Sequence, residues 1–244
     1  MASKSESGHE KNIAAFKTIL NTCQGYGADY NPVADNLKIT NLQTQLTETQ
    51  SAQTELLKKR AKLGTTIDER IKAFAQLKPI TTRVLNALIV SGVDKLNINT
   101  AKTITRKISG KRAAKITEPQ NPGEEQPNTS SVSQLSFVNQ VAHLNALLEL
   151  LAELLLYNPN EAPIQIPQLQ TYRDQLQTLN DAAMQAYNDF DNAKILRDNK
   201  LYAPNTGIFD TAYAIKAYVK SLYGPRSPQY KLISGIELTR KKGM

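Results

Sequence analysis

A short pattern that occurs twice constrains the fold of this chain more than any other feature. YNPVADNLKITNLQT begins at Tyr30, and YNPNEAPIQIPQLQT begins at Tyr157, 127 positions later. Self-similarity at a fixed offset is the signature of a repeated supersecondary unit. Further pairs at an offset of 127 are Gln50/Gln177, Leu63/Phe190 and Arg70/Arg197, and pairs at an offset of 125 are Pro79/Pro204, Ala87/Ala212 and Ile108-Ser109-Gly110/Ile233-Ser234-Gly235.

The repetition predicts a tandem duplication, with a first repeat at residues 8–115 and a second at residues 132–244. Between them, ITEPQNPGEEQPNTSS at 116–131 has three prolines, a glycine and no apolar periodicity. This composition is typical of an exposed linker. We expect the two repeats to pack together as one bundle, because a lone three-helix unit covers its apolar seams poorly.

Each repeat is predicted to contain three helices and a tail. Ser7 with Glu10 has the spacing of a capping box at the start of the first helix, and Ser131 with Gln134 has the same spacing in the second repeat. Glycines at 25 and 27 supply a stop for the first helix. The third helices are expected after the prolines at 79 and 204, and the segments that follow them are rich in β-branched residues. For both tails, this composition is compatible with an extended segment, a small hairpin or disorder.

A seam of apolar residues predicts one long helix in each repeat. In the first repeat, positions 42, 46, 49, 53, 56, 60, 63, 67, 70, 74 and 77 alternate steps of four and three, which suits coiled-coil-like packing. Gly64 could stop this helix, but the seam keeps its phase past it, so we favour one helix from Asn41 to Gln76. In the second repeat, the seam of the first helix is Phe137, Val141, Leu144, Leu148, Leu151 and Leu155, and that of the long helix is Leu169, Tyr172, Leu176, Leu179, Ala183, Ala186, Phe190 and Ala193.

Taken together, these patterns predict an all-α fold. We expect an up-and-down helical bundle from a tandem duplication of a three-helix unit, with short irregular or extended basic tails. The longest apolar run, from Leu144 to Leu156, is shorter than the roughly 20 residues of a membrane span, so we expect a buried helix there and no span. The N-terminus has no apolar core of a signal peptide, and we therefore expect a cytoplasmic protein.

The residues that usually carry catalysis or bind metals are scarce. The one cysteine, Cys23, cannot form an intramolecular disulfide or a cysteine-based zinc site, and its apolar helix position favours inert core. His9 is placed in the N-terminal tail, and Ile13 stands where an HExxH motif would need its second histidine. His143 lies beside the seam residue Leu144, which favours a packed or boundary histidine. We therefore predict no catalytic residue, no cofactor and no metal site.

Two features leave a pocket open as a further hypothesis. Glu149 and Glu153 lie four residues apart in a leucine-rich helix, where two buried carboxylates could perform acid–base chemistry. A solvated stripe on that helix is the alternative, and we favour it. The tyrosines of the second repeat could line a ligand pocket between the two repeats, although filling of the bundle seams is the favoured interpretation. They include Tyr172, Tyr187, Tyr202, Tyr213, Tyr218 and Tyr223.

The net charge of +8 is concentrated in two segments. Residues 95–117 hold seven Lys/Arg and no acid, and residues 215–244 hold seven Lys/Arg and one acid, Glu237. Lys/Arg clusters suit phosphate contacts without sequence readout, whereas a solvated tail or docking to a protein would need no such contact. The candidate polyanion-binding residues are Lys102, Arg106, Lys107, Lys111, Arg112, Lys115, Lys231, Arg240, Lys241 and Lys242.

These features favour a non-enzymatic interaction or structural protein with an unidentified protein partner. The alternative function is binding of nucleic acid or another polyanion through the two basic segments. A ligand-binding or enzymatic pocket between the repeats is the third hypothesis.

Overall fold

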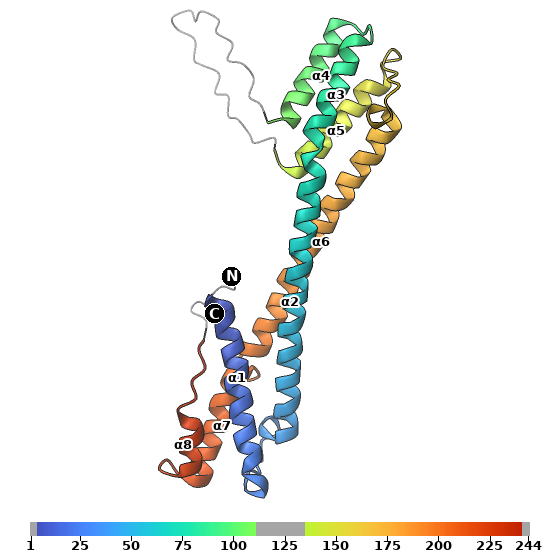
Figure 1. Cartoon of the computed structure of the whole chain (residues 1–244). Helices are drawn as coiled ribbons and strands as arrows, with labels where there is room; N and C mark the ends of the chain where they lie inside the picture. Colours follow the sequence, from blue (N-terminus) through green and yellow to red (C-terminus); the bar gives the residue numbers. More distant parts are fainter. Residues whose placement is uncertain (1–3, 111–134, 241–244) are drawn as a thin grey trace, which may run out of the picture. The chain divides into compact units, whose positions relative to one another are not determined.

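The computed structural model describes residues 4–110 and 135–240, and all regular secondary structure in these ranges is helical (Figure 1). The expected all-α fold is confirmed for this part of the chain. The α-helices are α1 (Lys4–Gly25), α2 (Ile39–Ala75), α3 (Leu77–Val90), α4 (Lys95–Ile108), α5 (Phe137–Ala152), α6 (Ile166–Tyr202), α7 (Ile208–Tyr223) and α8 (Pro228–Ser234), and the short 3-10 helices are Gly27–Asp29, Asp35–Leu37 and Ala162–Ile164. The predicted linker at 116–131 and the predicted cap at Ser131 and Gln134 lie outside the described residues.

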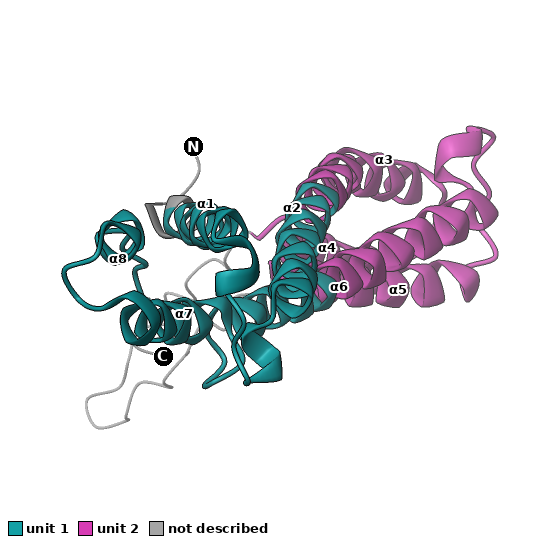
Figure 2. Cartoon of the chain, turned by 90° about the horizontal axis from the view of Figure 1, so that it is seen from below, with its two compact units in different colours: residues 1–62, 187–244 teal, residues 63–186 magenta. Residues whose placement is uncertain are grey.

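The helices form two compact units, and each unit combines parts of both predicted repeats (Figure 2). Unit 1 consists of residues 1–62 and 187–244, and unit 2 consists of residues 63–186. Within unit 1, α1 contacts α7 and α8, and within unit 2, α4 contacts α3 and α5. The division of the structure thus differs from the predicted repeat boundaries at 8–115 and 132–244.

The length of α2 and α6 accounts for this division. Each has 37 residues, and α6 begins 127 positions after α2. At 1.5 Å per residue, such a helix is about 55 Å long, which is more than one small core can cover. Leu42 and Leu46 of α2 therefore belong to the apolar cluster of unit 1, and Phe74 of the same helix belongs to that of unit 2.

Helix α2 runs without interruption past Gly64, which confirms the prediction of a continuous helix. Most seam positions are buried as expected, and the buried set also contains the polar residues Thr49 and Gln53. The exceptions are Arg60, which is exposed, and Ile67 and Arg70, which are half-buried. The regular spacing of the seam was thus a better predictor of helix continuity than the glycine at position 64.

The core of unit 1 joins residues from the two ends of the chain. Ile13, Phe16 and Leu20 of α1 pack with Ile215 and Val219 of α7, and all five side chains are at most 5% exposed. The helix that was expected after Pro204 is therefore present as α7. In unit 2 the equivalent cluster contains Leu77, Val84, Leu88, Ala101, Val141, Leu144, Leu147, Leu148, Leu151, Leu169 and Leu176.

The prediction of irregular tails is wrong for Lys95–Ile108 and Pro228–Ser234, which form helices α4 and α8, whereas residues 235–240 have no regular secondary structure. Asp94 caps α4 by accepting hydrogen bonds from the backbone N–H groups of Leu96 and Asn97, and Ser227 caps α8 by accepting from Tyr230 N. Burial of one face of α4 outweighs the low helix propensity of its threonines and isoleucines. The buried residues of α4 are Ala101, Thr105 and Ile108.

Three further predictions need correction. Helix α1 begins at Lys4, so Ser7 lies inside the helix and is not its N-cap. Helix α5 ends at Ala152, so Leu155 lies beyond it and is 95% exposed, whereas the seam had placed it in the core. Pro79 lies in the first turn of α3, but Pro204 lies in the turn before α7, and so these two prolines are not structural equivalents.

Both Tyr-Asn-Pro loops are closed by the same hydrogen bond. Tyr30 Oη donates to the carbonyl oxygen of Leu37 at 3.1 Å, and Tyr157 Oη donates to that of Ile164 at 2.7 Å. Each acceptor belongs to a short 3-10 helix just before a long helix. Both tyrosine rings are 5% exposed, so each loop is anchored in the core of its own unit.

Candidate functional site

The structure distributes the predicted basic residues over both units. Lys102, Arg106 and Lys107 lie on α4 in unit 2, whereas Lys231 on α8 and Arg240 after it lie in unit 1. Lys111, Arg112, Lys115, Lys241 and Lys242 lie outside the described residues.

The α4 residues form a cationic face. Lys102 and Lys107 are exposed, and α4 contains no acidic residue. Arg106 is half-buried, and its buried Nε has no hydrogen-bond partner among the residues that the structure describes. His143 of α5 lies within the electrostatic reach of Lys107, and burial, with this charge as the second cause, lowers the pKa of His143 below its usual 6.5. The face is therefore positive without a compensating carboxylate on its own helix.

Arg240 has a structural contact that the sequence did not suggest. Its Nη2 donates to the carbonyl oxygen of Tyr202 at 3.3 Å, and its guanidinium carbon lies 5.4 Å from the centre of the Phe209 ring. Cation–π contacts of this kind hold a side chain against an aromatic face. Arg240 therefore fastens the segment after α8 onto unit 1.

A buried polar network in unit 1 was missed by the sequence analysis. His9 was placed in the N-terminal tail, but it lies in α1, is 3% exposed, and its Nδ1 is 2.7 Å from Tyr202 Oη. Asn12 Nδ2 donates to Tyr202 Oη at 3.0 Å and to Thr239 O at 2.8 Å, and Asn12 Oδ1 accepts from Thr239 N at 2.9 Å. Asn12 thus pairs with the backbone of Thr239 at both of its amide atoms.

Lys216 also holds the C-terminal segment against unit 1. Lys216 of α7 is 9% exposed, and its ammonium group donates to the carbonyl oxygens of Ile236 and, at 3.4 Å, of Ser234. Burial lowers the pKa of Lys216. Ser234 is the last residue of α8 and Ile236 lies just after it, so the cation is near unpaired acceptors and the negative end of the helix dipole. The buried polar groups of unit 1 therefore hold helices together.

The other candidate groups do not converge on a site. Glu149 and Glu153 are both exposed, which agrees with the solvated stripe and gives no support to buried acid–base carboxylates. Cys23 is fully buried, and burial raises the pKa of its thiol to about 12, so it is protonated at neutral pH. Among the described residues, no group of three or more His, Cys, Asp and Glu is arranged to hold a metal ion, and no helix is long and apolar enough to cross a membrane.

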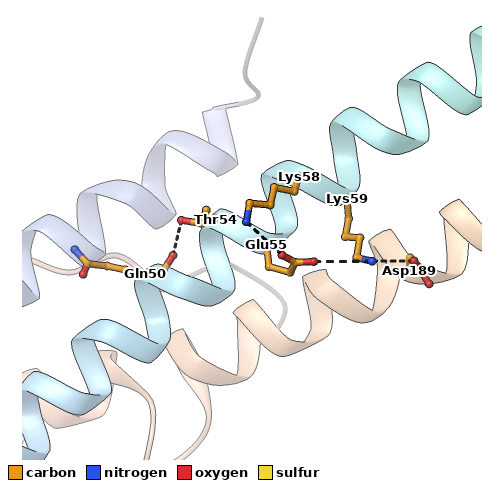
Figure 3. Close-up of polar contacts among 6 residues, drawn as sticks. All are labelled: Gln50, Thr54, Glu55, Lys58, Lys59 and Asp189. Carbon is orange, nitrogen blue, oxygen red and sulfur yellow. Dashed lines mark hydrogen bonds and ion pairs between the residues drawn. The ribbon is translucent and has the colours of Figure 1, made fainter.

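The long helices carry an open groove in unit 1. It has a volume of about 650 Å³ and is lined by residues of α2 between Thr47 and Lys58 and by Leu196 and Lys200 of α6. Figure 3 shows Lys59 of α2 reaching across to Asp189 of α6, 2.9 Å away, with Glu55 on its other side at 3.9 Å. A second ion pair joins Lys200 to Glu48 at 2.6 Å. These pairs link the two helices in this unit.

A second groove lies in unit 2 between α3 and the loop at residues 153–161, which we call the YNPN loop. Its volume is about 610 Å³. The groove residues from α3 and the turn after it are Arg83, Asn86, Ala87, Val90 and Ser91, and those from the YNPN loop and the 3-10 helix after it are Leu156, Tyr157, Asn158, Pro159, Asn160, Glu161 and Ile164. It combines apolar side chains with one cation, one anion and three amides.

Comparison of the chain with models of protein families, with curated proteins and with solved structures finds no match.

Proposed function

We propose that this chain is a non-enzymatic interaction protein, in which a duplicated helical bundle presents binding surfaces to a protein partner. The duplication itself is part of the proposal. It is supported by the equal lengths of α2 and α6, by their offset of 127 residues, and by the same tyrosine-to-carbonyl hydrogen bond before each of them.

One observation carries the proposal: large apolar side chains are exposed around the groove of unit 2. Val90 is 83% exposed, Leu155 is 95% exposed and Leu156 is 59% exposed. Val90 and Leu156 line the same groove, and Leu155 is the neighbour of Leu156 in the YNPN loop. Apolar groups gathered at a groove with a polar rim are typical of interaction surfaces.

A pull-down from native lysate tests the proposal. The tagged chain is compared with a Leu155→Glu variant, with and without nuclease treatment. We expect a protein partner that is retained by the native chain after nuclease treatment and lost by the variant. Val33→Glu is the matched control, because Val33 lies in unit 1 and is 96% exposed. Capture of the same proteins by all three chains would contradict a role of this surface.

Polyanion binding is the second candidate, and the cationic face of α4 supports it. The observation is the exposure of Lys102 and Lys107 on a helix without an acidic residue. The contribution of the basic residues beyond α4 and α8 belongs to this proposal as well. Lys/Arg contacts to phosphates release counterions, so such binding weakens steeply with salt.

Fluorescence anisotropy with a labelled DNA duplex tests this candidate at several salt concentrations. Lys102→Gln/Lys107→Gln should reduce the slope of log K against log salt by about 2, because each phosphate contact contributes about 0.9 to it. Lys17→Gln/Lys220→Gln removes the same charge from exposed positions of unit 1 and should leave the slope unchanged. Equal effects of both double variants would refute binding at α4.

A further inference from the structure

The groove of unit 2 carries an inference about the identity of the partner. One wall is formed by α3, and the other by the YNPN loop, which Figure 1 shows beside the turn between α3 and α4. Leu156 of this loop lies near Gly92, which follows α3.

Tyr157 anchors the YNPN loop in the core of unit 2. This ring is 5% exposed, and its hydroxyl donates to Ile164 O at 2.7 Å. Burial raises the pKa of Tyr157 to about 12, so the hydroxyl keeps its proton at neutral pH. The exposure of Leu155 and Leu156 therefore belongs to an ordered loop, in which their side chains face solvent although the loop is anchored.

The charges of the groove are of opposite sign and are unpaired among the described residues. Arg83 and Glu161 both line it and are both exposed. In the described ranges 4–110 and 135–240, neither of them takes part in an ion pair or a side-chain hydrogen bond. Glu161 precedes the 3-10 helix Ala162–Ile164 but makes no capping bond with its side chain.

Apolar side chains together with one cation and one anion are the residue types that a surface needs to pair with its own copy. In a two-fold dimer the same patch meets its own copy, so residue i of one chain contacts residue j of the other, and j contacts i. Arg83 of one copy can then pair with Glu161 of the second copy, twice per dimer. The apolar side chains of Val90, Leu155 and Leu156 would be buried between these two pairs.

We propose that the groove of unit 2 is the interface of a homodimer, and that the partner which it binds is a second copy of this chain. The mixed signs of the rim disfavour a strongly acidic or strongly basic partner, because each would meet one like charge. The inference rests on the proposed function, since it names the partner of the same apolar surface. It adds the reciprocal pairing of Arg83 and Glu161.

Sedimentation velocity of the purified full chain between about 1 and 100 µM tests the dimer, because this range covers a micromolar dissociation constant. We expect a concentration-dependent monomer–dimer equilibrium. Leu155→Glu should weaken it by about tenfold or more, because two charges then enter the apolar centre. Val33→Glu should leave it unchanged. Since Leu155 and Val33 are 95% and 96% exposed, neither substitution is expected to disturb folding, and circular dichroism checks this.

A charge exchange tests the pairing itself. Arg83→Glu should weaken the dimer by about tenfold, because two ion pairs become two like-charge contacts. Glu161→Arg should do the same, and the double variant Arg83→Glu/Glu161→Arg should restore association to within about threefold. Arg226→Glu is the control, since it makes the same charge change at an exposed position of unit 1.

Three results would overturn the inference. They are a single monomeric species over the whole concentration range, a dimer that Val33→Glu or Arg226→Glu dissociates, and a double charge variant that stays as weak as the single ones. A monomeric chain that still captures another protein in the pull-down would leave the proposed function standing. A dimer without any other captured protein would support the inference and limit the function to self-association.

Discussion

The hydroxyl that closes each Tyr-Asn-Pro loop gives the most direct test of the repeated geometry. Tyr157→Phe removes the group that donates to Ile164 O at 2.7 Å, and Tyr30→Phe removes the group that donates to Leu37 O at 3.1 Å. The phenylalanine ring keeps the packing of each site nearly unchanged. Both tyrosines are 5% exposed, so solvent has little access to the carbonyl that loses its donor.

Each substitution should lower the free energy of unfolding by about 1–2 kcal/mol. A hydrogen bond contributes about 1 kcal/mol net, and a buried acceptor that is left unpaired costs about 1–3 kcal/mol. Tyr30 and Tyr157 belong to different apolar clusters. The two losses should therefore add to within about 0.5 kcal/mol in the double variant.

Urea unfolding followed by circular dichroism measures these losses. Tyr187→Phe is the control, because Tyr187 on α6 is 45% exposed and loses the same hydroxyl group in a solvated position. The control should stay within about 0.5 kcal/mol of the native chain. If Tyr30→Phe and Tyr157→Phe are no more destabilising than the control, the hydrogen bonds do not stabilise the loops and the reasoning is wrong.

Three further substitutions test other contacts. Asn12→Ala should lower the free energy of unfolding in urea by about 2–4 kcal/mol, because three hydrogen bonds of a 2% exposed side chain are lost. The control Asn21→Ala, on the exposed side of α1, should change it by less than about 0.5 kcal/mol. Equal losses would contradict the pairing of Asn12 with Thr239. Burial lowers the pKa of His143 below 6.5, so as the pH falls the imidazole is protonated in the unfolded chain before it is protonated in the folded one. The free energy of unfolding should therefore decrease below about pH 6.5, and His143→Gln should reduce this decrease. An unchanged pH dependence in the variant would assign it to another group. Lys59→Ala removes a partly exposed ion pair with Asp189 and should lower the free energy of unfolding by less than about 1 kcal/mol. In 1 M NaCl the variant should be as stable as the native chain, because salt screens the pair. A loss that persists in high salt would indicate a packing contribution of Lys59.

The long helices were predictable because their signal is long. A seam that keeps one phase over many turns outweighs a single glycine, and α2 accordingly passes through Gly64. The stops at the helix ends were predictable for a local reason. Gly27 has a φ of +59° and Gly224 a φ of +86°, and this left-handed region favours glycine.

Helices α4 and α8 were not predicted, because β-branched residues were given more weight than the caps. Asp94 and Ser227 each precede a helix, and Pro228 follows Ser227 at the first helical position, which is a recognised start signal. For Leu155, the heptad spacing continues past the true end of α5. The end of α5 depends on tertiary contacts of the YNPN loop that follows it, and a periodic sequence pattern does not show such contacts.

The polar network of unit 1 shows a different limit of sequence reasoning. His9 and Tyr202 are 193 positions apart, and Asn12 and Thr239 are 227 positions apart. Neither pair follows a local spacing rule, since each contact depends on how α1 packs against the other end of the chain. The position of His9 near the N-terminus suggested a tail, whereas Ile13 and Phe16 on the same helix already indicated a buried face.

The division of the structure cuts across the two proposed repeats. Each proposed repeat supplies one long helix, and each long helix contributes to both apolar clusters. Each apolar cluster therefore contains residues of both proposed repeats. This arrangement explains why the loop pattern at Tyr30 and at Tyr157 is repeated with its hydrogen bond, while the exposed residues around it differ. Val33 follows the first loop, and Leu155 and Leu156 precede the second. The buried tyrosine serves the core of each unit, and the exposed neighbours are free to form a binding surface in only one of them.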